Sequence, residues 1–343
     1  MTTESVIRMT FADGEETHVT CGESTTIFDA ARSAGVALAH DCLNGTCGTC
    51  RGTLTAGTVA YALEADQLAL PKGESAGQPE AMLLCQAKPT SASVDLTLPY
   101  SRASLLPEKK RKLKVLSKTR VSETVWDVRC KAEGLRMFDF LPGQYVRVTP
   151  SGQNFTRAYS PYTVPGTAEI GFLIRELENG AMSHYLRDHP VESDVWAVSG
   201  PYGVFYRRHT HAPSLYVAGG TGLAPVLSML SAQQKLGLST GPKKVVFGVT
   251  RASDLFYVKE LQALAEAMPE VSVVVTVMEG ATEPSIRQAS VVDVLSEADF
   301  AELGQHGAAY LCGPPGMVNA VRDRAAGWAV AQSRIFSEEF LPS

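Results

Sequence analysis

Alternating and periodic hydrophobic positions divide the chain into three blocks, the first of which mixes strands with a helix. Strand-like alternation occurs at residues 5–11 and 17–21, and "SASVDLTL" predicts another strand that ends near residue 98. Between them, "TTIFDAARSAGVAL" places four apolar side chains on one helical face: Ile27, Ala30, Ala31 and Ala34. The pattern is typical of an α+β domain.

The second block consists of short alternating segments separated by turn residues. These segments are "KLKVLSKTRV", "VWDVRC", "QYVRVT", "EIGFLIREL" and "DVWAVSG". Closely spaced short strands of this kind indicate an antiparallel barrel or sandwich.

The third block alternates buried strands with helices. "SLYVAGG" leads into "LAPVLSMLSAQQKL", "KKVVFGVT" into "VKELQALAEAM", and "AAYLCG" into "GMVNAVRDRAAGWAV". Such alternation predicts a parallel α/β sheet.

These patterns predict domains at 1–100, 112–207 and 208–343, with a linker at 101–111. The segment "PYSRASLLPEKKRK" around the linker contains two prolines and a basic run. We interpret the basic run as a solvated face, with docking onto a partner as the alternative.

Charge and hydropathy then limit the function. The chain of 343 residues has a formal net charge of -5, which offers no electrostatic footprint for nucleic acid. Residues 1–100 hold twelve Asp and Glu against five Lys and Arg, so the acidity is local to the first block. Apolar runs such as "VSVVVTV" are strand-sized and too short to span a membrane, and the N-terminus lacks the apolar core of a signal peptide. We therefore expect a cytoplasmic protein with no membrane partner.

Three cysteines of the first block are clustered, and a fourth follows at a distance. Cys42, Cys47 and Cys50 have the spacing C-x4-C-x2-C, and Cys85 lies thirty-four intervening residues downstream. This spacing is that of plant-type [2Fe-2S] sites. Zinc and unligated thiols are alternatives, but structural zinc sites usually draw on two close pairs, and Cys85 has no near companion. An odd total of seven cysteines argues against a disulfide framework.

Four motifs and the C-terminus carry further candidate chemistry. The motifs are "RAYS" at 157–160, "NGAMSHYL" at 179–186, "AGGTGLAPVLSML" at 218–230 and "YLCGPPGMV" at 310–318, followed by "IFSEEFLPS". A glycine-rich turn between a strand and a helix lets a dinucleotide pyrophosphate approach the helix N-terminus. Each of these segments except "NGAMSHYL" also has a simpler interpretation. "RAYS" could be exposed strand residues and the glycine-rich turn a tight connection. Cys312 could be a buried thiol in a proline turn, and the C-terminus a frayed tail.

Taken in order, the motifs carry a family resemblance. Residues 1–100 resemble a plant-type ferredoxin, and residues 110–343 resemble the ferredoxin-NADP reductase family. Together they resemble the reductase component of benzoate and anthranilate ring-hydroxylating dioxygenases. The resemblance implies a β-grasp [2Fe-2S] ferredoxin domain, an antiparallel β-barrel FAD domain and a parallel α/β nucleotide-binding domain.

The resemblance implies roles for five residues at the FAD. Arg157 would pair with the pyrophosphate, Tyr159 would stack on the isoalloxazine, and Ser160 would lie near flavin N5. Gly180 would let the backbone approach the phosphates, and Ser183 would donate from a helix N-terminus.

One position departs from the family pattern. Family members usually carry an ordinary apolar residue after R-x-Y-S, whereas this chain has Pro161. Because proline has no backbone N–H, a flavin contact through that donor is not expected here.

Two segments are implied to bind the nicotinamide dinucleotide: Gly219, Gly220, Thr221 and Gly222 in the first, and Cys312, Gly313 and Pro314 in the second. Thr221 and Cys312 would lie on either side of the nicotinamide, with Cys312 close to its C4. Phe340 corresponds to the family's terminal aromatic residue near the flavin. Tyr159, Ser160, Thr221, Cys312 and Phe340 would thus surround the hydride path.

The choice between NADH and NADPH is expected in "GVTRASDLFY". Asp254 can bond the adenosine ribose hydroxyls and repel a phosphate, whereas Arg251 can attract one. Because close relatives favour NADH, we expect NADH, with Asp254 as a ribose ligand and NADPH as the alternative.

The function implied by the resemblance is electron transfer from NADH through FAD and the cluster to a Rieske oxygenase that dihydroxylates aromatic rings. No Rieske pattern occurs in the sequence, so oxygen activation would fall to a partner. The alternatives are the reductase of a di-iron monooxygenase for phenol, toluene or methane, and an electron carrier whose flavin and nucleotide domains are vestigial. Nothing in the sequence requires more than a monomer.

Overall fold

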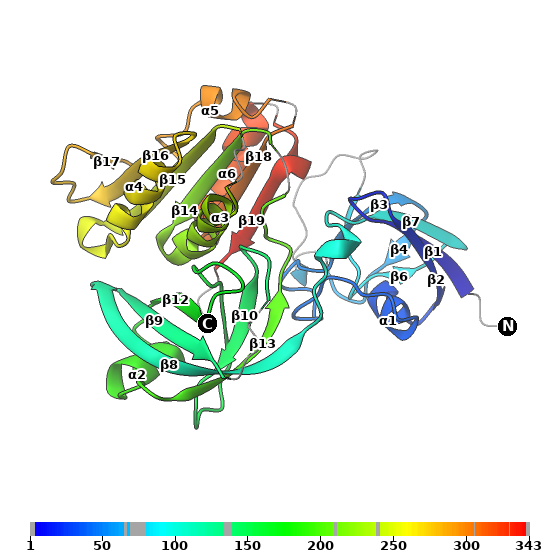
Figure 1. Cartoon of the computed structure of the whole chain (residues 1–343). Coiled ribbons are helices and arrows are strands. Elements are labelled where there is room, and N and C mark those ends of the chain that lie inside the picture. Colours follow the sequence, from blue (N-terminus) through cyan, green and yellow to red (C-terminus); the bar gives the residue numbers. More distant parts are fainter. Residues whose placement is uncertain are drawn as a thin grey trace. The chain divides into compact units, whose positions relative to one another are not determined.

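The computed structural model in Figure 1 forms two compact units. The first consists of Met1–Pro107 with Tyr202–Val204, and the second of Glu108–Pro201 with Phe205–Ser343. The residues that the structure describes are 4–64, 67–68, 80–133, 139–208, 211–237, 241–304, 306–328 and 330–340.

The first unit is a mixed sheet with a helix against it. Its strands lie in the order β2-β1-β7-β3-β5. They are β1 Glu4–Thr10, β2 Glu16–Gly22, β3 Arg51–Ala56, β5 Glu80–Leu83 and β7 Ser93–Thr97. A small pair, β4 Val59–Ala60 and β6 Lys88–Pro89, and the helices α1 Ile27–Ser33 and η2 Arg102–Ser104 complete the unit. β1 runs parallel to β7 and antiparallel to β2, and the expected β-grasp ferredoxin fold is confirmed.

Local sequence determines where α1 begins and ends. The Thr26 side chain caps the helix by accepting a bond from the Asp29 N–H at 3.1 Å. The helix ends at Ser33, and Gly35 follows with a φ of +73°. Ala34, predicted on the buried face, is exposed because the helix stops before it.

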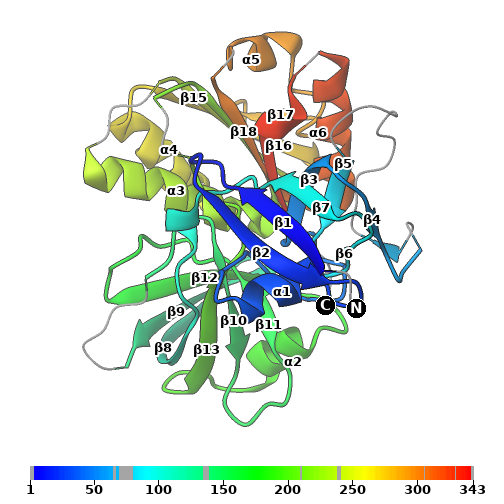
Figure 2. The same cartoon turned by 90° about the vertical axis from the view of Figure 1, so that its right-hand side faces the viewer.

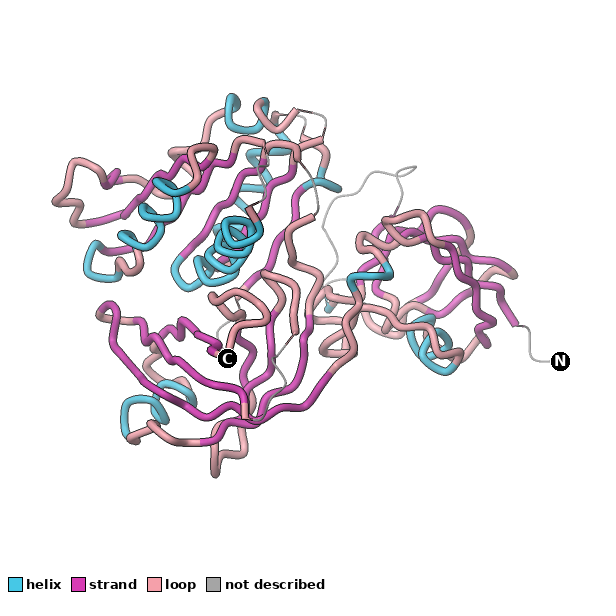
Figure 3. The backbone as a smooth tube through the Cα atoms, in the orientation of Figure 1, coloured by secondary structure: helices cyan, strands magenta, loops and turns pink. Residues whose placement is uncertain are grey.

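The second unit begins with an antiparallel barrel. Its strands lie in the order β11-β10-β13-β8-β9-β12. They are β8 Lys109–Ser122, β9 Val125–Ala132, β10 Tyr145–Thr149, β11 Arg157–Tyr159, β12 Glu169–Arg175 and β13 Val195–Tyr202, with the helix α2 Ala181–Asp188. Figure 3 draws strands in magenta and helices in cyan in the orientation of Figure 1, which labels most of these elements. A bridge between Pro161 and Phe172 joins the end of β11 to β12 and closes the barrel.

The basic run belongs to the first barrel strand. β8 begins at Lys109, so the last residues of the predicted linker are part of a strand. Lys112 and Lys114 are exposed, whereas Leu113 and Val115 point into the barrel core. The alternation agrees with a solvated outer face.

The rest of the second unit is a parallel sheet covered on both faces. Its strands lie in the order β17-β16-β15-β14-β18-β19. They are β14 Ser214–Gly219, β15 Lys243–Arg251, β16 Val271–Glu279, β17 Ile286–Gln288, β18 Ala308–Gly313 and β19 Ile335–Glu339. The helices are α3 Leu223–Leu236, α4 Val258–Ala267, α5 Glu297–Ala301 and α6 Pro315–Gly327, with short 3-10 turns η3 Gly220–Gly222, η4 Ala252–Asp254 and η5 Gln332–Arg334.

Alternation along the strands gives this sheet two apolar faces. Tyr216 and Phe247 pack in one core cluster with residues of α3 and α4, and Val217 and Leu311 pack in another with residues of α5 and α6. Figure 2 shows α3 and α4 on one side of this sheet and α6 on the other. The chain winds outward from β14 in one direction to β17 and then returns to β18 on the other side. The carboxyl ends of β14 and β18 are therefore a topological switch point, where ligands of such sheets bind.

The predicted α3 and β18 agree residue for residue with the structure, and the expected parallel α/β domain is confirmed. β17, α5 and β19 were not predicted. The C-terminal segment is not a frayed tail up to Phe340, because β19 pairs with β18 along its length. No helix in the described parts of the chain is long and apolar enough to cross a membrane.

Candidate functional site

Strand pairing brings the fourth cysteine to the other three. The loop between α1 and β3 carries Cys42, Cys47 and Cys50, and Cys85 lies in the turn after β5. β3 pairs with β5 so that the Leu84 N–H donates to the Cys50 carbonyl at 3.1 Å. The register of these two strands therefore places Cys85 beside Cys50.

Glycine lets the cysteine loop close against that turn. Gly45 has a φ of +87°, and a Cβ there would lie 2.9 Å from Leu68 Cδ2 and 3.0 Å from Gln86 Cγ. Gln86 Nε2 donates to the Leu43 carbonyl at 3.0 Å, which ties the loop to the residue after Cys85. A side chain at position 45 would open this contact.

The four thiols interact in two pairs. The Cys50 thiol donates to the Cys85 sulfur, which lowers the pKa of Cys85 to about 6 and raises that of Cys50. The Cys42 N–H donates to the Cys47 sulfur at 3.5 Å. Burial alone would raise the pKa of Cys42, but hydrogen bonds, first that from Cys47, outweigh it and lower this pKa.

Paired thiols fit a two-iron cluster better than a single ion. A [2Fe-2S] cluster held by four cysteines takes two thiolates at each iron. Within the described parts of the chain, no group of three or more His, Cys, Asp or Glu side chains could hold one metal ion. All seven cysteines are free thiols and all lie in described segments. The donor set therefore matches the predicted cluster.

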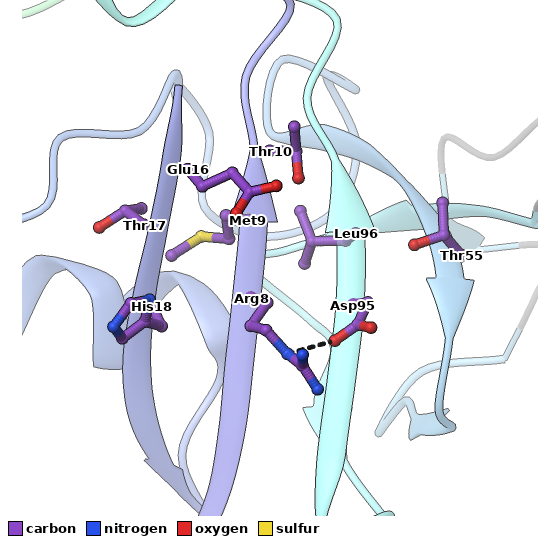
Figure 4. A pocket seen from close by; sticks show the side chains of 9 residues that line it. All are labelled: Arg8, Met9, Thr10, Glu16, Thr17, His18, Thr55, Asp95 and Leu96. Carbon is purple, nitrogen blue, oxygen red and sulfur yellow. Dashed lines mark ion pairs between the residues drawn. The ribbon is translucent and has the colours of Figure 1, made fainter. Parts of the chain in front are cut away.

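A pocket of the first unit lies apart from the predicted site residues. It is hollowed on the sheet between β2, β1 and β7, where Arg8, Glu16, His18 and Asp95 point outward (Figure 4). Arg8 Nε pairs with Asp95 Oδ1 at 3.0 Å across β1 and β7. None of the four cysteines lines the pocket.

In the barrel, the R-x-Y-S motif lies on β11 and just beyond it. Arg157 and Tyr159 are half-buried, and the Tyr159 ring centroid lies 6.3 Å from that of Phe172. Ser160 is only 4% exposed, and its Oγ has no hydrogen-bond partner among the described residues. A buried hydroxyl without a partner is rare and costly. The barrel therefore presents a polar atom that fits a missing partner such as bound FAD.

The second predicted phosphate element lies at the start of α2. Gly180 is the N-cap and makes no side-chain capping bond. Ser183 is buried, and its Oγ accepts a bond from the Leu177 N–H at 2.8 Å, which leaves the hydroxyl proton to donate elsewhere. Free N–H groups at a helix N-terminus suit a phosphate.

The two predicted dinucleotide segments meet at the carboxyl ends of β14 and β18. A Cβ on Gly222 would lie 2.2 Å from the Cys312 carbonyl oxygen, and one on Gly219 would lie 3.0 Å from Pro314. Gly220 and Thr221 form the rest of η3, which is only partly buried. The segments therefore form one continuous surface at the switch point.

Cys312, Gly313 and Phe340 are neighbours at the same edge. The Phe340 N–H donates to the Gly313 carbonyl at 3.0 Å, and Phe340 packs on the core that contains Cys312. Cys312 is fully buried, and burial with the nearby charge of Glu338 raises its thiol pKa well above the usual value. The thiol therefore stays neutral and is not set up as a nucleophile.

Glu338 was missed by sequence reasoning. It pairs with Cys312 across β18 and β19, and although the residue as a whole is half-buried, desolvation of its carboxyl raises the pKa to about 8. The signal was present, because Glu338 occupies the first position of the terminal element resembling E-K-F. A carboxyl that titrates near neutrality beside the nucleotide edge is a candidate functional group.

Asp254 lies in η4, directly after the parallel strand β15. Its carboxylate accepts a bond from Thr124 Oγ1 of the barrel at 2.9 Å and pairs with Arg251 Nε at 3.4 Å. Asp254 is only 9% exposed. Its predicted contact with ribose hydroxyls stays a prediction and would require these bonds to be exchanged.

Comparisons with known proteins agree with this arrangement. The family described as a 2Fe-2S iron-sulfur cluster binding domain matches residues 10–90. The oxidoreductase FAD-binding domain matches 112–206, and the oxidoreductase NAD-binding domain matches 216–323. The matches define an oxidoreductase with a [2Fe-2S] cluster, FAD and NAD(H) as cofactors.

Two curated relatives extend over nearly the whole chain. The electron transfer component of 2-halobenzoate 1,2-dioxygenase from Burkholderia cepacia is 32% identical over 98% of this chain and 98% of the relative. The electron transfer component of anthranilate 1,2-dioxygenase from Acinetobacter baylyi is 32% identical over 98% and 97%. The chain belongs to the family of electron transfer, or reductase, components of aromatic-ring dioxygenases.

A solved structure shows the same fold. The cytochrome P450 reductase GcoB of Amycolatopsis matches with a TM-score of 0.69 and 24% identity, over 98% of this chain and 99% of that chain. At this identity the likeness concerns the fold alone.

Replacing the distant cysteine tests the cluster site. Cys85→Ser should abolish the visible and EPR signals of the cluster and most of the bound iron, because one iron loses a thiolate. The matched control is Cys21→Ser, whose side chain is buried and can still donate to the Thr25 carbonyl. Equal iron content in both variants would contradict the assignment of Cys85.

Adding a methyl group at the switch point tests the nucleotide site. Gly222→Ala forces the loop away from the Cys312 carbonyl, so KM for NADH should rise about tenfold or more, since a displaced binding backbone weakens the complex. Gly327→Ala at the end of α6, where a Cβ meets nothing within 4 Å, should leave KM unchanged. An unchanged KM in Gly222→Ala would count against this site.

The raised pKa of Glu338 predicts a pH dependence of stability. The carboxyl ionises at about 8 in the folded chain against an ordinary 4.5, so between these values the folded state holds a proton that the unfolded state has released. The free energy of unfolding therefore falls as pH rises through this window. The difference in thermal midpoint, Glu338→Gln minus wild type, should therefore increase from about pH 5 to about pH 8 and stay constant above that.

The control for this measurement is Glu339→Gln, which changes the exposed neighbouring carboxylate. It should show no such trend. A constant difference between Glu338→Gln and wild type across the pH range would show that burial does not shift Glu338.

Proposed function

We propose that this protein oxidises NADH and passes the electrons singly to the Rieske oxygenase component of an aromatic-ring dioxygenase. The observation that supports this most is the full-length similarity to dioxygenase electron transfer components, joined to a paired set of four cysteines and an edge where both dinucleotide segments meet. The similarity to these components favours a Rieske oxygenase as the electron acceptor over the oxygenase component of a di-iron monooxygenase.

The barrel would hold FAD through residues on β11 and α2. Arg157 would bind the pyrophosphate through its fork of donors, and Gly180 and Ser183 would bind it at the helix N-terminus. Tyr159 would lie along the isoalloxazine, and the Ser160 hydroxyl would donate toward the flavin nitrogen that it faces. When bound, FAD accepts a hydride from NADH and releases electrons one at a time.

The sheet edge would hold NADH. Gly219, Gly220, Thr221 and Gly222 would bind the pyrophosphate at the start of α3, with Gly313 and Pro314 forming the opposite wall. The neutral thiol of Cys312 and the Phe340 ring would exclude water around the nicotinamide. Neither residue needs to act as an acid or a nucleophile.

Cys42, Cys47, Cys50 and Cys85 would hold the [2Fe-2S] cluster in the acidic first block. Backbone N–H groups such as that of Cys42 point at the sulfurs and favour the thiolate form. The local negative charge would steer association with a basic patch on the oxygenase, an effect on rate that salt screens.

Several finer points belong to the same proposal. We take the domains as 1–100, 112–207 and 208–343, and the protein as a monomer that prefers NADH to NADPH. We place it in the cytoplasm, because its cysteines are free thiols and a thiolate-held cluster suits a reducing compartment.

An absorption spectrum tests the function. The purified protein should show overlapping flavin and cluster bands that bleach on anaerobic addition of NADH and bleach less readily with NADPH. The Cys85→Ser variant should still reduce ferricyanide with NADH but should not reduce a Rieske oxygenase. A colourless protein containing zinc, or no bleaching by either nucleotide, would refute the proposal.

A further inference from the structure

A buried carboxylate in the barrel bonds to two tyrosines. Asp127 of β9 is 6% exposed. Tyr162 Oη donates to its Oδ1 at 2.9 Å, and Tyr257 Oη donates to its Oδ2 at 2.8 Å. Arg129 Nε donates to the same Oδ2 at 3.1 Å and balances the charge. Buried charges persist when they are paired and hydrogen-bonded in this way.

The two tyrosines belong to different parts of the second unit. Tyr162 follows β11 in the barrel, whereas Tyr257 is the N-cap of α4 on the parallel sheet. Tyr257 has a φ of +53°, an unusual conformation for a tyrosine that costs on the order of 1 kcal/mol or more. The bond to Asp127 offsets that cost and links the sheet to the barrel.

The barrel side of this link continues directly from the flavin motif. Ser160 is followed by Pro161, which bridges Phe172, and then by Tyr162, whose N–H donates to the Gly171 carbonyl at 3.0 Å. A Cβ on Gly171 would lie 2.3 Å from the Tyr162 ring, so the ring lies flush on β12. The two residues that separate Ser160 from the hydroxyl bonded to Asp127 are therefore both held against β12.

The same segment contacts α3, the helix that follows the glycine-rich turn. Ser228 Oγ of α3 donates to the Thr163 carbonyl at 2.7 Å. α3 begins just after the glycine-rich turn that contains Thr221. This bond is therefore a second connection between the segment after Ser160 and the element that carries Thr221. The Thr124 bond to Asp254 adds a third contact between barrel and sheet.

Hydride transfer makes strict demands on this geometry. The reacting atoms must approach to about 3–3.5 Å, and a displacement of about 1 Å can lower the rate by about a hundredfold. Ser160 and Tyr159 lie in the barrel, whereas Thr221 and Cys312 lie on the sheet. The distance between flavin and nicotinamide therefore depends on how barrel and sheet are held together.

We propose that Asp127 is a positioning residue for hydride transfer, which by holding the hydroxyls of Tyr162 and Tyr257 sets the barrel residue Ser160 against Thr221 and Cys312 of the sheet. The inference rests on the proposed oxidation of NADH. Burial raises the pKa of both tyrosines, so both hydroxyls remain protonated donors to the carboxylate.

The most direct variant is Asp127→Asn, which keeps the shape of the side chain but turns one acceptor into a donor. The amide is neutral and keeps only one acceptor oxygen for the two hydroxyls and the Arg129 guanidinium. A tyrosine facing the amide N–H must turn its hydroxyl to accept, so the link is weakened. The full-length protein with FAD bound is mixed anaerobically with NADH, and flavin absorbance is followed by stopped flow.

The expected result separates chemistry from binding. The rate constant of flavin reduction at saturating NADH should fall about tenfold or more, whereas half-saturation and FAD content should change less than about twofold. The long-wavelength absorbance of the flavin–nicotinamide complex should weaken in parallel. Tyr257→Phe should act in the same direction, and the double variant should be no slower than Asp127→Asn.

The matched control is Asp299→Asn. Asp299 is also a buried carboxylate with several donors, from Ser296 and Lys244, but all of them lie on the sheet side. Asp299→Asn should lower the thermal midpoint and leave the rate of flavin reduction unchanged. A purely structural role for Asp127 would make the two variants behave alike.

Wild-type rates of flavin reduction in Asp127→Asn, or equal slowing in Asp299→Asn, would overturn the inference. Should Asp127→Asn fail to retain FAD, the rate of Tyr257→Phe decides in its place. A wild-type protein that NADH does not reduce would instead refute the proposed function, so the two failures are distinct.

Discussion

The meeting of β14 and β18 at their carboxyl ends is the constraint on which the second unit depends. The chain leaves β14 toward one edge of the sheet and β18 toward the other, so the loops after these two strands lie side by side. A Cβ on Gly222 would lie 2.2 Å from the Cys312 carbonyl oxygen. In the proposed dinucleotide site, one loop would offer the helix N-terminus and the other the facing wall. Sheet topology thus brings together two predicted binding segments that lie ninety residues apart in the sequence.

In the first unit the corresponding constraint is strand register. β3 and β5 set Leu84 against Cys50, and that single pairing fixes which thiol approaches Cys85. The sequence spacing predicts four ligands, but it does not divide them into pairs. That division follows from long-range pairing of strands, which no local pattern contains.

Local patterns predicted what is decided locally. The α3 helix and the β18 strand were predicted residue for residue, because continuous apolar runs between glycine and proline signals mark them clearly. β19 was missed, since "IFSEEF" has two carboxylates and becomes a strand only by pairing with β18. Asp127 and Tyr257 are far apart in sequence, and nothing in "VWDVRC" or "DLFYVKEL" signals that they bond.

Asp254 shows a second case in which a local pattern could not predict a long-range contact. A carboxylate at the end of a second parallel strand suggests a ribose ligand by general rule. The barrel hairpin was not part of that reasoning, and its Thr124 occupies the carboxylate in the structure. Contacts between domains are thus the part of a site that sequence spacing conveys least.

The lone hydroxyl of Ser160 has a consequence for the abundance of the protein in a cell. An unpartnered buried hydroxyl costs about 1–3 kcal/mol, and a ligand that satisfies it only in the folded chain stabilises that chain by mass action. If bound FAD is that ligand, as we propose, folding of the barrel is coupled to flavin supply. A cell short of riboflavin would then contain less of the folded reductase, and not only an inactive form of it. The chain without cofactor would be less stable, so more of it would be unfolded and degraded by proteases.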